Sequence, residues 1–338
     1  MTDRAALSAA FIAAAGWGDA QRRFLAGDAS DRSYDRLTRG AESAVLMDAP
    51  PGKGDDTATF AAIAAHLAGL GLSPPRILAA DHANGFLLLE DLGDGLVARL
   101  VAADPAMEAP LYEAATDVLL ELHRHPAPAG LPDLTAQDWA DAAAFAFDWY
   151  AFAASGTAPD SRDFRAVLAD AMAAHADGPR VMILRDYHAE NLLWLPERQG
   201  VARVGLLDFQ LAQMGQRAYD LVSLLQDARR DVSPETAAAM TRRFREATGQ
   251  DAASFSAAYA TLGAQRALRI TGIFARLCLK GGKAGYLPLL PRVWGQLQEN
   301  LTHPALARLR AVCDAALPPP DTDTLARIAR QCGTHPHR

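Results

Sequence analysis

The sequence has little that would cross-link the chain, anchor it in a membrane or bind it to nucleic acid. Its three cysteines, Cys278, Cys313 and Cys332, are widely spaced and form no C-x-x-C pair, so neither a disulfide framework nor a zinc site is indicated. The apolar stretch near the N-terminus is much shorter than the ~20 residues of a membrane helix and lacks the basic start of a secretory signal. No long basic run occurs and the formal net charge is −7, which argues against a general nucleic-acid binder. We therefore expect a cytoplasmic protein without a membrane or nucleic-acid partner.

The size and composition of the chain allow an enzyme with more than one domain. The chain has 338 residues and half of them, 50%, are hydrophobic, which is enough for one large core or two moderate ones. The acidic balance does not oppose nucleotide binding, because a nucleotide can be held by loops, backbone amides and metal ions.

Candidate catalytic residues are concentrated in one segment of the chain. Two short apolar runs, 181–184 and 204–207, are typical of buried strands, and the segment between them is polar. Four residues separate Asp186 from Asn191, and Asp208 follows the second run. If the two runs pair as a hairpin, the three side chains come together. Their oxygen atoms would suit magnesium, which binds through few protein ligands, several waters and the phosphates of a nucleotide.

The same spacing occurs in protein kinases. There, an Asp of the catalytic loop accepts the proton of the substrate hydroxyl, an Asn after four further residues binds magnesium, and the Asp of a later Asp-Phe-Gly binds it too. In this chain Asp186, Asn191 and the triplet Asp208-Phe209-Gln210 occupy those positions. The alternative is that Asp186 and Asn191 only cap turns. The two flanking apolar runs and the Asp-Phe pair favour the catalytic interpretation.

Three segments, LRDYHAENLLWLP, LLDFQ and YDLVSLLQDARRDV, resemble those of the aminoglycoside phosphotransferase superfamily of small-molecule kinases. More narrowly, they are similar to the anomeric kinases of bacterial cell-wall recycling, which act on N-acetylmuramate and N-acetylglucosamine. The resemblance implies an α+β, bilobal, protein-kinase-like fold with a small antiparallel-sheet N-lobe and a larger, mostly helical C-lobe. It also implies ATP and Mg²⁺ as cofactors, Asp186 as the catalytic base, and Asn191 and Asp208 as metal ligands.

The expected lobes can be placed on the chain. The N-lobe would cover residues 1–91 and the C-lobe residues 92–317, with residues 318–338 as a loose tail after three consecutive prolines. The pair Asn84-Gly85, between two apolar runs, predicts a type I′ hairpin turn. That hairpin would complete a five-stranded sheet in the N-lobe.

Loops of the N-lobe are expected to bind the phosphates of ATP. Ser30 and Ser33 lie in a turn of small residues whose backbone amides could cover the phosphates, as glycine-rich loops do. The strand predicted over 43–48 carries Met47 where protein kinases have a phosphate-binding lysine. Lys53, in a nearby loop, is the candidate replacement, and a solvated loop lysine is the alternative interpretation.

The connection between the lobes is expected to bind adenine. Glu90 and Leu92 lie where the last strand of the N-lobe runs into the C-lobe. Extended backbone at such a connection offers both an acceptor and a donor to the base, so the identity of the side chains matters little.

A basic stripe on a late helix is a candidate for substrate binding. At about 100° per residue, Arg266, Arg269, Arg276 and Lys280 fall within about 80° of one another. A stripe that faces the substrate would suit an anion such as the lactyl carboxylate of N-acetylmuramate. The alternative is an ordinary solvent-exposed face.

Three functions remain open from the sequence. The resemblance favours a monomeric kinase that phosphorylates the anomeric hydroxyl of the amino sugars N-acetylmuramate and N-acetylglucosamine in peptidoglycan recycling. A kinase of aminoglycosides, choline or homoserine on the same fold is the second, although a basic stripe does not suit polycationic aminoglycosides. A nucleotide-binding regulator is the third, suggested by the missing lysine; the presence of Asp186, Asn191 and Asp208 argues against it.

Overall fold

The chain forms two compact units, each assembled from separate stretches of sequence. The structure is a computed structural model, and it describes residues 3–27, 32–52 and 56–337. The first unit comprises Met1–His125 and Ala189–Ala212, and the second comprises Pro126–His188 and Gln213–Arg338. The candidate catalytic segment is therefore divided: Asp186 belongs to the second unit, whereas Asn191 and Asp208 belong to the first.

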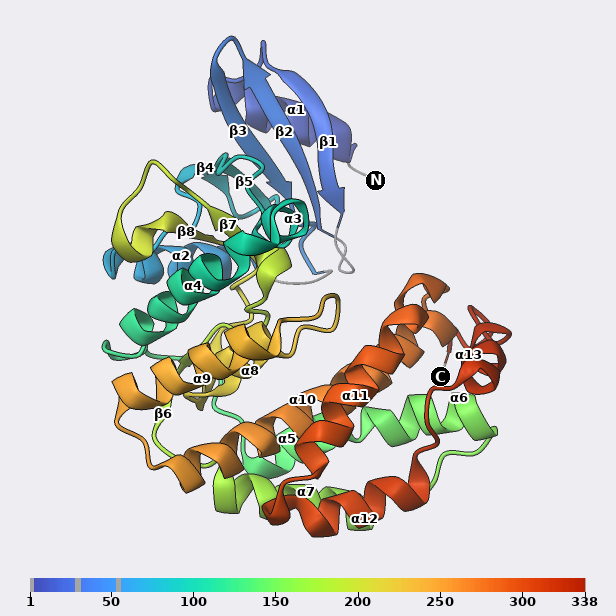
Figure 1. Ribbon diagram of the computed structural model, residues 1–338. Helices are drawn as coiled ribbons and strands as arrows, with labels where there is room; N and C mark the ends of the chain where they lie inside the picture. The colour runs from blue at the N-terminus through green and yellow to red at the C-terminus, as the bar shows by residue number, and fades with distance from the viewer. Residues whose placement is uncertain (1–2, 28–31, 53–55, 338) are drawn as a thin grey trace. The chain divides into compact units, whose positions relative to one another are not determined.

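The first unit contains a five-stranded antiparallel sheet with the strand order β1-β2-β3-β5-β4 (Figure 1). The strands are β1 (Gln21–Gly27), β2 (Ser33–Arg39), β3 (Glu42–Asp48), β4 (Ile77–Asp81) and β5 (Phe86–Glu90). Helix α1 (Arg4–Ala14) packs on this sheet through Phe11, whose ring stacks on Phe86 with centroids 5.7 Å apart. Leu37 and Leu46 are fully buried in the same apolar cluster. The five-stranded sheet predicted from the sequence is confirmed.

The turn between β4 and β5 is longer than the predicted type I′ turn. It spans residues 82–85, all of them described, and only Gly85 has a positive φ, at 73°. A type I′ turn requires positive φ at two consecutive positions. Asp81 instead closes the loop, because its carboxylate accepts hydrogen bonds from the backbone amide of Asn84 at 3.0 Å and from the Asn84 side chain at 2.8 Å. The prediction of a two-residue turn is therefore wrong.

Helices and a short hairpin complete the first unit and attach the segment that carries Asp208. They are α2 (Thr57–Gly69), α3 (Val97–Ala103), η1 (Pro105–Met107), α4 (Glu108–Leu122), η3 (Ala189–Asn191), β7 (Leu192–Trp194), η4 (Gly200–Arg203) and β8 (Val204–Leu206). The backbone amide of Leu206 donates to the carbonyl of Ser73 at 2.9 Å, and that of Trp194 donates to the carbonyl of Gly95 at 2.7 Å. The β7–β8 hairpin is thus hydrogen-bonded to segments more than 90 residues earlier in the chain.

The second unit is mostly helical. Its helices are α5 (Ala136–Ala143), η2 (Ala146–Ala151), α6 (Phe152–Ser155), α7 (Arg162–His175), α8 (Tyr219–Leu225), α9 (Pro234–Thr248), α10 (Ala252–Leu279), η5 (Ala284–Leu289), α11 (Leu290–Leu301), η6 (Pro304–Leu306), α12 (Ala307–Ala316) and α13 (Thr322–Ala329). The longest, α10, packs against α5, α7, α8, α11 and η2 (Figure 1). Within the described ranges, no helix combines the length and the apolar character that crossing a bilayer demands.

The two apolar runs around the candidate catalytic segment do not pair with each other, contrary to expectation. The first run forms β6 (Arg180–Ile183), which pairs with β9 (Gln213–Gln216) in the second unit. The second run forms β8, which pairs with β7 in the first unit. Strands β7 and β9 have only three and four residues and no alternating pattern, so sequence periodicity could not reveal them.

The C-terminal segment is folded, and the prediction of a loose tail is wrong. After the prolines, Asp321 caps α13 by accepting a hydrogen bond from the amide of Thr324 at 2.8 Å. Ile328 of this helix is fully buried. The hydroxyl of Tyr150 donates to the carbonyl of Pro318 at 2.7 Å, which fixes the segment before the helix.

Two helical glycines allow a test of the packing around α10. A Cβ at Gly272 would lie 2.1 Å from the carbonyl carbon of Phe145, whereas a Cβ at Gly295, exposed on α11, would meet nothing within 4 Å. We expect Gly272→Ala to lower the free energy of unfolding by about 1–3 kcal/mol through overpacking. Gly295→Ala should raise it by about 0.5–1 kcal/mol, because alanine is the better helix former. Urea denaturation measures both; effects of the same sign would contradict this packing.

Candidate active site

A buried carboxylate holds the backbone that precedes Asp186. Asp220 on α8 is fully buried and accepts hydrogen bonds from the backbone amides of Leu184 at 2.6 Å and Arg185 at 2.9 Å. Arg185 has a φ of 73°, and the hydroxyl of Ser223 donates to its carbonyl at 3.2 Å. A left-handed conformation is unfavourable for a residue with a side chain and persists only where its surroundings hold it. These contacts therefore set the direction in which the chain leaves β6 and presents the partly exposed Asp186.

The charge state of Asp220 reflects two opposing effects. Burial raises the pKa of its carboxyl to about 7, although the amides of Leu184 and Arg185 act in the opposite direction. Each of the two oxygens of the carboxylate accepts one of these amides. Asp220 therefore acts as an acceptor that positions the loop.

His188, two residues after Asp186, is not a second base. Its side chain is buried, and its Nε2 lies 3.3 Å from Nη1 of Arg229. A guanidinium can only donate, so Nε2 accepts and is not available to take a proton. Burial, with the charges of Arg229 and Arg266, lowers the pKa of His188 to about 3. The imidazole is therefore neutral and orders the loop through Arg229.

The three arginines predicted to bind substrate have different surroundings in the second unit. Arg266 is buried on α10, and its Nη1 donates to the carbonyl of Gln226 at 3.0 Å. Arg269 is partly buried. Arg276 is exposed, with its guanidinium carbon 5.9 Å from the centre of the Phe145 ring. The head group of Arg266 thus supports the segment after α8, and the three do not form one uniform basic surface.

In the first unit, Asp208 is paired with a buried arginine. The Oδ1 atom of Asp208 accepts hydrogen bonds from Nη2 of Arg32 and from Nε2 of Gln210, both at 2.8 Å. The Arg32 side chain is only 4% exposed, whereas that of Asp208 is 30% exposed. Asp208 also has a left-handed backbone, with φ at 55°. The carboxylate is thus held in place and still reaches solvent.

Asn191 lies beside Asp208 in the same unit. It ends the helical turn η3, and its carbonyl accepts a hydrogen bond from the amide of Leu207 at 2.9 Å. The β7–β8 hairpin therefore brings the two predicted metal ligands to neighbouring positions, one before β7 and the other after β8.

These two residues fit a magnesium ion that is bound together with phosphates. Across the described ranges, no group of three or more His, Cys, Asp and Glu side chains gathers to hold a metal. Magnesium commonly takes one or two carboxylates and completes its coordination with water and phosphate. Asp208 already attracts a cation, the guanidinium of Arg32. The donor set therefore suits Mg²⁺ held by Asn191, Asp208 and a nucleotide.

The structure describes only some of the residues that were predicted to bind the nucleotide. Ser30 and Lys53 lie outside the described residues. Ser33 opens β2 opposite Asp48 of β3 and is partly buried. Glu90 ends β5, and its carboxylate pairs with the exposed Arg76 at 3.2 Å and with Arg198 at 2.8 Å.

Leu92 follows two residues after Glu90 and is partly buried. Arg36, which the sequence did not single out, fixes this segment. Its guanidinium donates to the carboxylates of Asp91 and Asp94, each at 3.0 Å. Arg32 was also missed. Its place in the turn between the candidates Ser30 and Ser33 was the available signal, because a cation there could reach the same phosphates.

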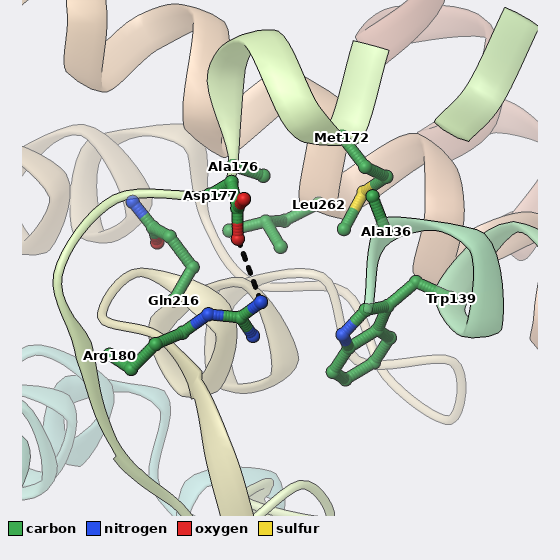
Figure 2. A pocket seen from close by; sticks show the side chains of 8 residues that line it. All are labelled: Ala136, Trp139, Met172, Ala176, Asp177, Arg180, Gln216 and Leu262. Carbon is green, nitrogen blue, oxygen red and sulfur yellow. Dashed lines mark hydrogen bonds and ion pairs between the residues drawn. The ribbon is translucent and has the colours of Figure 1, made fainter. Parts of the chain in front are cut away.

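The second unit contains a small pocket (Figure 2). It is lined by Ala136, Trp139, Met172, Ala176, Asp177, Arg180, Gln216 and Leu262. Arg180 and Asp177 form an ion pair at 2.7 Å in this pocket. Arg180 is the first residue of β6, whereas Asp186 follows the last, so the pocket and the catalytic loop lie at opposite ends of the strand.

The role of Asp220 can be tested by an isosteric change. In Asp220→Asn the amide group of the new side chain would face one of the two backbone amides, so a buried donor would lose its acceptor. We expect the free energy of unfolding to fall by about 1–3 kcal/mol. Asp251→Asn is the control, because Asp251 caps the exposed start of α10 and asparagine caps equally well. Equal effects in the two variants would contradict the positioning role.

The pKa of His188 predicts how stability depends on pH. Folding lowers this pKa from about 6.5 to about 3. The contribution of neutral His188 to the free energy of unfolding is therefore complete above pH 6.5 and is lost as the pH falls toward 3. In this range the wild type should lose up to about 1.4 kcal/mol per pH unit more than His188→Gln, whose side-chain oxygen can still accept from Arg229. Denaturation between pH 7 and pH 4.5 measures the difference; parallel curves would contradict it.

Comparison with known sequences identifies relatives along most of the chain. The model of the phosphotransferase enzyme family matches residues 21–258. The chain is 42% identical to the N-acetylmuramate/N-acetylglucosamine kinase of Caulobacter vibrioides, over 94% of this chain and 98% of that protein. It is 35% identical to the kinase of the same name from Pseudomonas aeruginosa, over 88% of this chain and 89% of the relative.

Solved structures share the fold at low sequence identity. A choline/ethanolamine kinase family protein from Mesorhizobium loti has a TM-score of 0.60 and 17% identity, covering 97% of this chain and 100% of that chain. The GDP complex of aminoglycoside 2′-phosphotransferase IIIa has a TM-score of 0.60 and 15% identity, covering 93% and 99%. The α+β protein-kinase-like fold and the family resemblance are both confirmed. The chain belongs to the phosphotransferase enzyme family and is a kinase that phosphorylates an alcohol group.

Proposed function

We propose that this kinase uses ATP and Mg²⁺ to phosphorylate the anomeric hydroxyl of N-acetylmuramate and N-acetylglucosamine. The observation that carries the proposal is the 42% identity over 94% of the chain to a kinase named for these two sugars. Asp186, Asn191 and Asp208 supply the carboxylate base and the oxygen ligands that such a transfer needs. The products would be a sugar 1-phosphate and ADP, and we place the reaction in peptidoglycan recycling in the cytoplasm.

In the proposed mechanism, Asp186 orients the sugar hydroxyl and accepts its proton. A bond forms between the sugar oxygen and the γ-phosphorus while the bond from that phosphorus to the bridging oxygen of ADP breaks. Asn191 and Asp208 would hold Mg²⁺, which would neutralise charge on the phosphates. Most of the rate enhancement would come from alignment and charge stabilisation, because phosphoryl transfer asks little covalent chemistry of the protein.

The loop architecture supports this assignment of roles. Asp220 fixes the backbone of Leu184 and Arg185, and Arg229 occupies Nε2 of His188. The backbone before Asp186 and the side chain of His188 after it are thus both held by hydrogen bonds, and Asp186 itself is partly exposed. A base held in this way loses little orientational freedom when the hydroxyl binds.

The proposal can be tested with purified protein, ATP and Mg²⁺. ADP release is measured with N-acetylmuramate, N-acetylglucosamine, kanamycin, choline and homoserine. We expect turnover only with the two amino sugars, and ³¹P spectra that show phosphorus coupled to the anomeric proton. Asp186→Asn should lower kcat by about 10²–10⁴-fold, because the general base is lost. Asp163→Asn, an exposed acid in the first turn of α7, should leave kcat unchanged.

Other outcomes have distinct meanings. Turnover with kanamycin, choline or homoserine alone would refute the substrate while leaving the kinase family intact. Full activity in Asp186→Asn would refute the assignment of the base. Binding of ATP without turnover on any acceptor would favour a regulator.

A further inference from the structure

The first unit lacks the lysine with which protein kinases bind phosphates from the third strand. Met47 occupies that position in β3 and is fully buried between Tyr34 of β2 and Leu87 of β5. The lysines of the chain are Lys53, Lys280 and Lys283. Lys53 lies outside the described residues, and the other two belong to the second unit. Among the described residues of the first unit, the side chains with a permanent positive charge are therefore arginines, and the one beside Asp208 is the candidate considered next.

Arg32 is the arginine that contacts the proposed metal ligand. It lies directly before β2, its side chain is 4% exposed, and its Nη2 is 2.8 Å from Oδ1 of Asp208. A magnesium ion held at Asp208 would neutralise charge on the nucleotide phosphates. The phosphates must then approach the carboxylate that Arg32 already contacts.

Other described arginines of the first unit pair with carboxylates that have no proposed role in metal binding. Arg36, also on β2, pairs with Asp91 and Asp94 after β5. Arg22 pairs with Asp35 of the neighbouring strand, and Arg4 pairs with Asp48. Arg32 differs because its carboxylate partner is the residue that would bind the metal.

We propose that Arg32 binds the nucleotide phosphates in place of the missing lysine and pairs with Asp208 while the site is free of nucleotide. This inference rests on the proposed function. When Mg²⁺ takes Asp208, the buried guanidinium loses a carboxylate, which is costly unless another anion replaces it. The phosphates of the nucleotide provide that anion.

Binding of ADP and of adenosine distinguishes this role from support of the fold, because only ADP carries phosphates. Isothermal titration of the full chain with ADP and Mg²⁺, and with adenosine, gives both affinities. Arg32→Met should lower the affinity for ADP by about 10- to 100-fold and change the affinity for adenosine by no more than about twofold. Arg32→Lys, which keeps the charge without the planar fork, should fall between the wild type and Arg32→Met.

Arg39→Met is the matched control. Arg39 ends the same strand, but it is partly exposed and pairs with the exposed Glu42 at 2.7 Å. The Arg39→Met variant should bind ADP and adenosine with the affinities of the wild type. Circular dichroism shows whether each variant is folded, and Arg32→Lys preserves the test if Arg32→Met is not.

Two results would overturn the inference. If the affinities for ADP and for adenosine both stay at the wild-type values in Arg32→Met and Arg32→Lys, Arg32 does not bind phosphate. If both ligands are lost equally in a folded variant, Arg32 supports the structure alone. A wild-type protein that binds neither adenosine nor ADP would instead refute the nucleotide dependence of the proposed function, and the inference with it.

Discussion

The hydrogen bonds of Asp220 to the backbone before Asp186 are the constraint on which the catalytic loop depends. An unfavourable left-handed residue, Arg185, directs the chain out of β6, and the buried carboxylate makes that conformation the stable one. Since the acceptor comes from α8, more than 30 residues later, the loop takes its shape only when the second unit is folded. The geometry at Asp186, the proposed base, is thus tied to the core of a helical unit.

Buried arginines perform a related task in the first unit. Arg32 and Arg36 flank the start and the middle of β2, and each has at least one carboxylate partner far along the chain. A guanidinium has a planar fork of donors and stays charged at any relevant pH, so it can be buried where a lysine would be prone to lose its proton. The unit therefore positions acidic groups with arginine. In its third strand, the position of the kinase lysine is taken by Met47, which is apolar and fully buried.

Much of the fold was predictable, and the reasons for the failures are physical. The strand predicted over 43–48 and the apolar runs around Asn84-Gly85 predicted a five-stranded sheet, and the spacing of Asp186, Asn191 and Asp208 predicted the candidate site. Strand pairing was mispredicted because β7 and β9 are too short to leave a pattern. The contact between Arg32 and Asp208 joins residues 176 positions apart, and a charged residue in a loop carries no sign of its distant partner.

The division of the first unit between two stretches of sequence has a consequence for synthesis. Its hairpin β7–β8 bonds to the backbone at Ser73 and Gly95, yet the chain builds much of the second unit's first stretch, 126–188, before that hairpin exists. During synthesis on the ribosome, the first unit therefore cannot be completed until residue 212 has been added to the chain. A fragment that stops at residue 125 would leave the carbonyl groups of Ser73 and Gly95 without the hairpin and would expose the surface it covers.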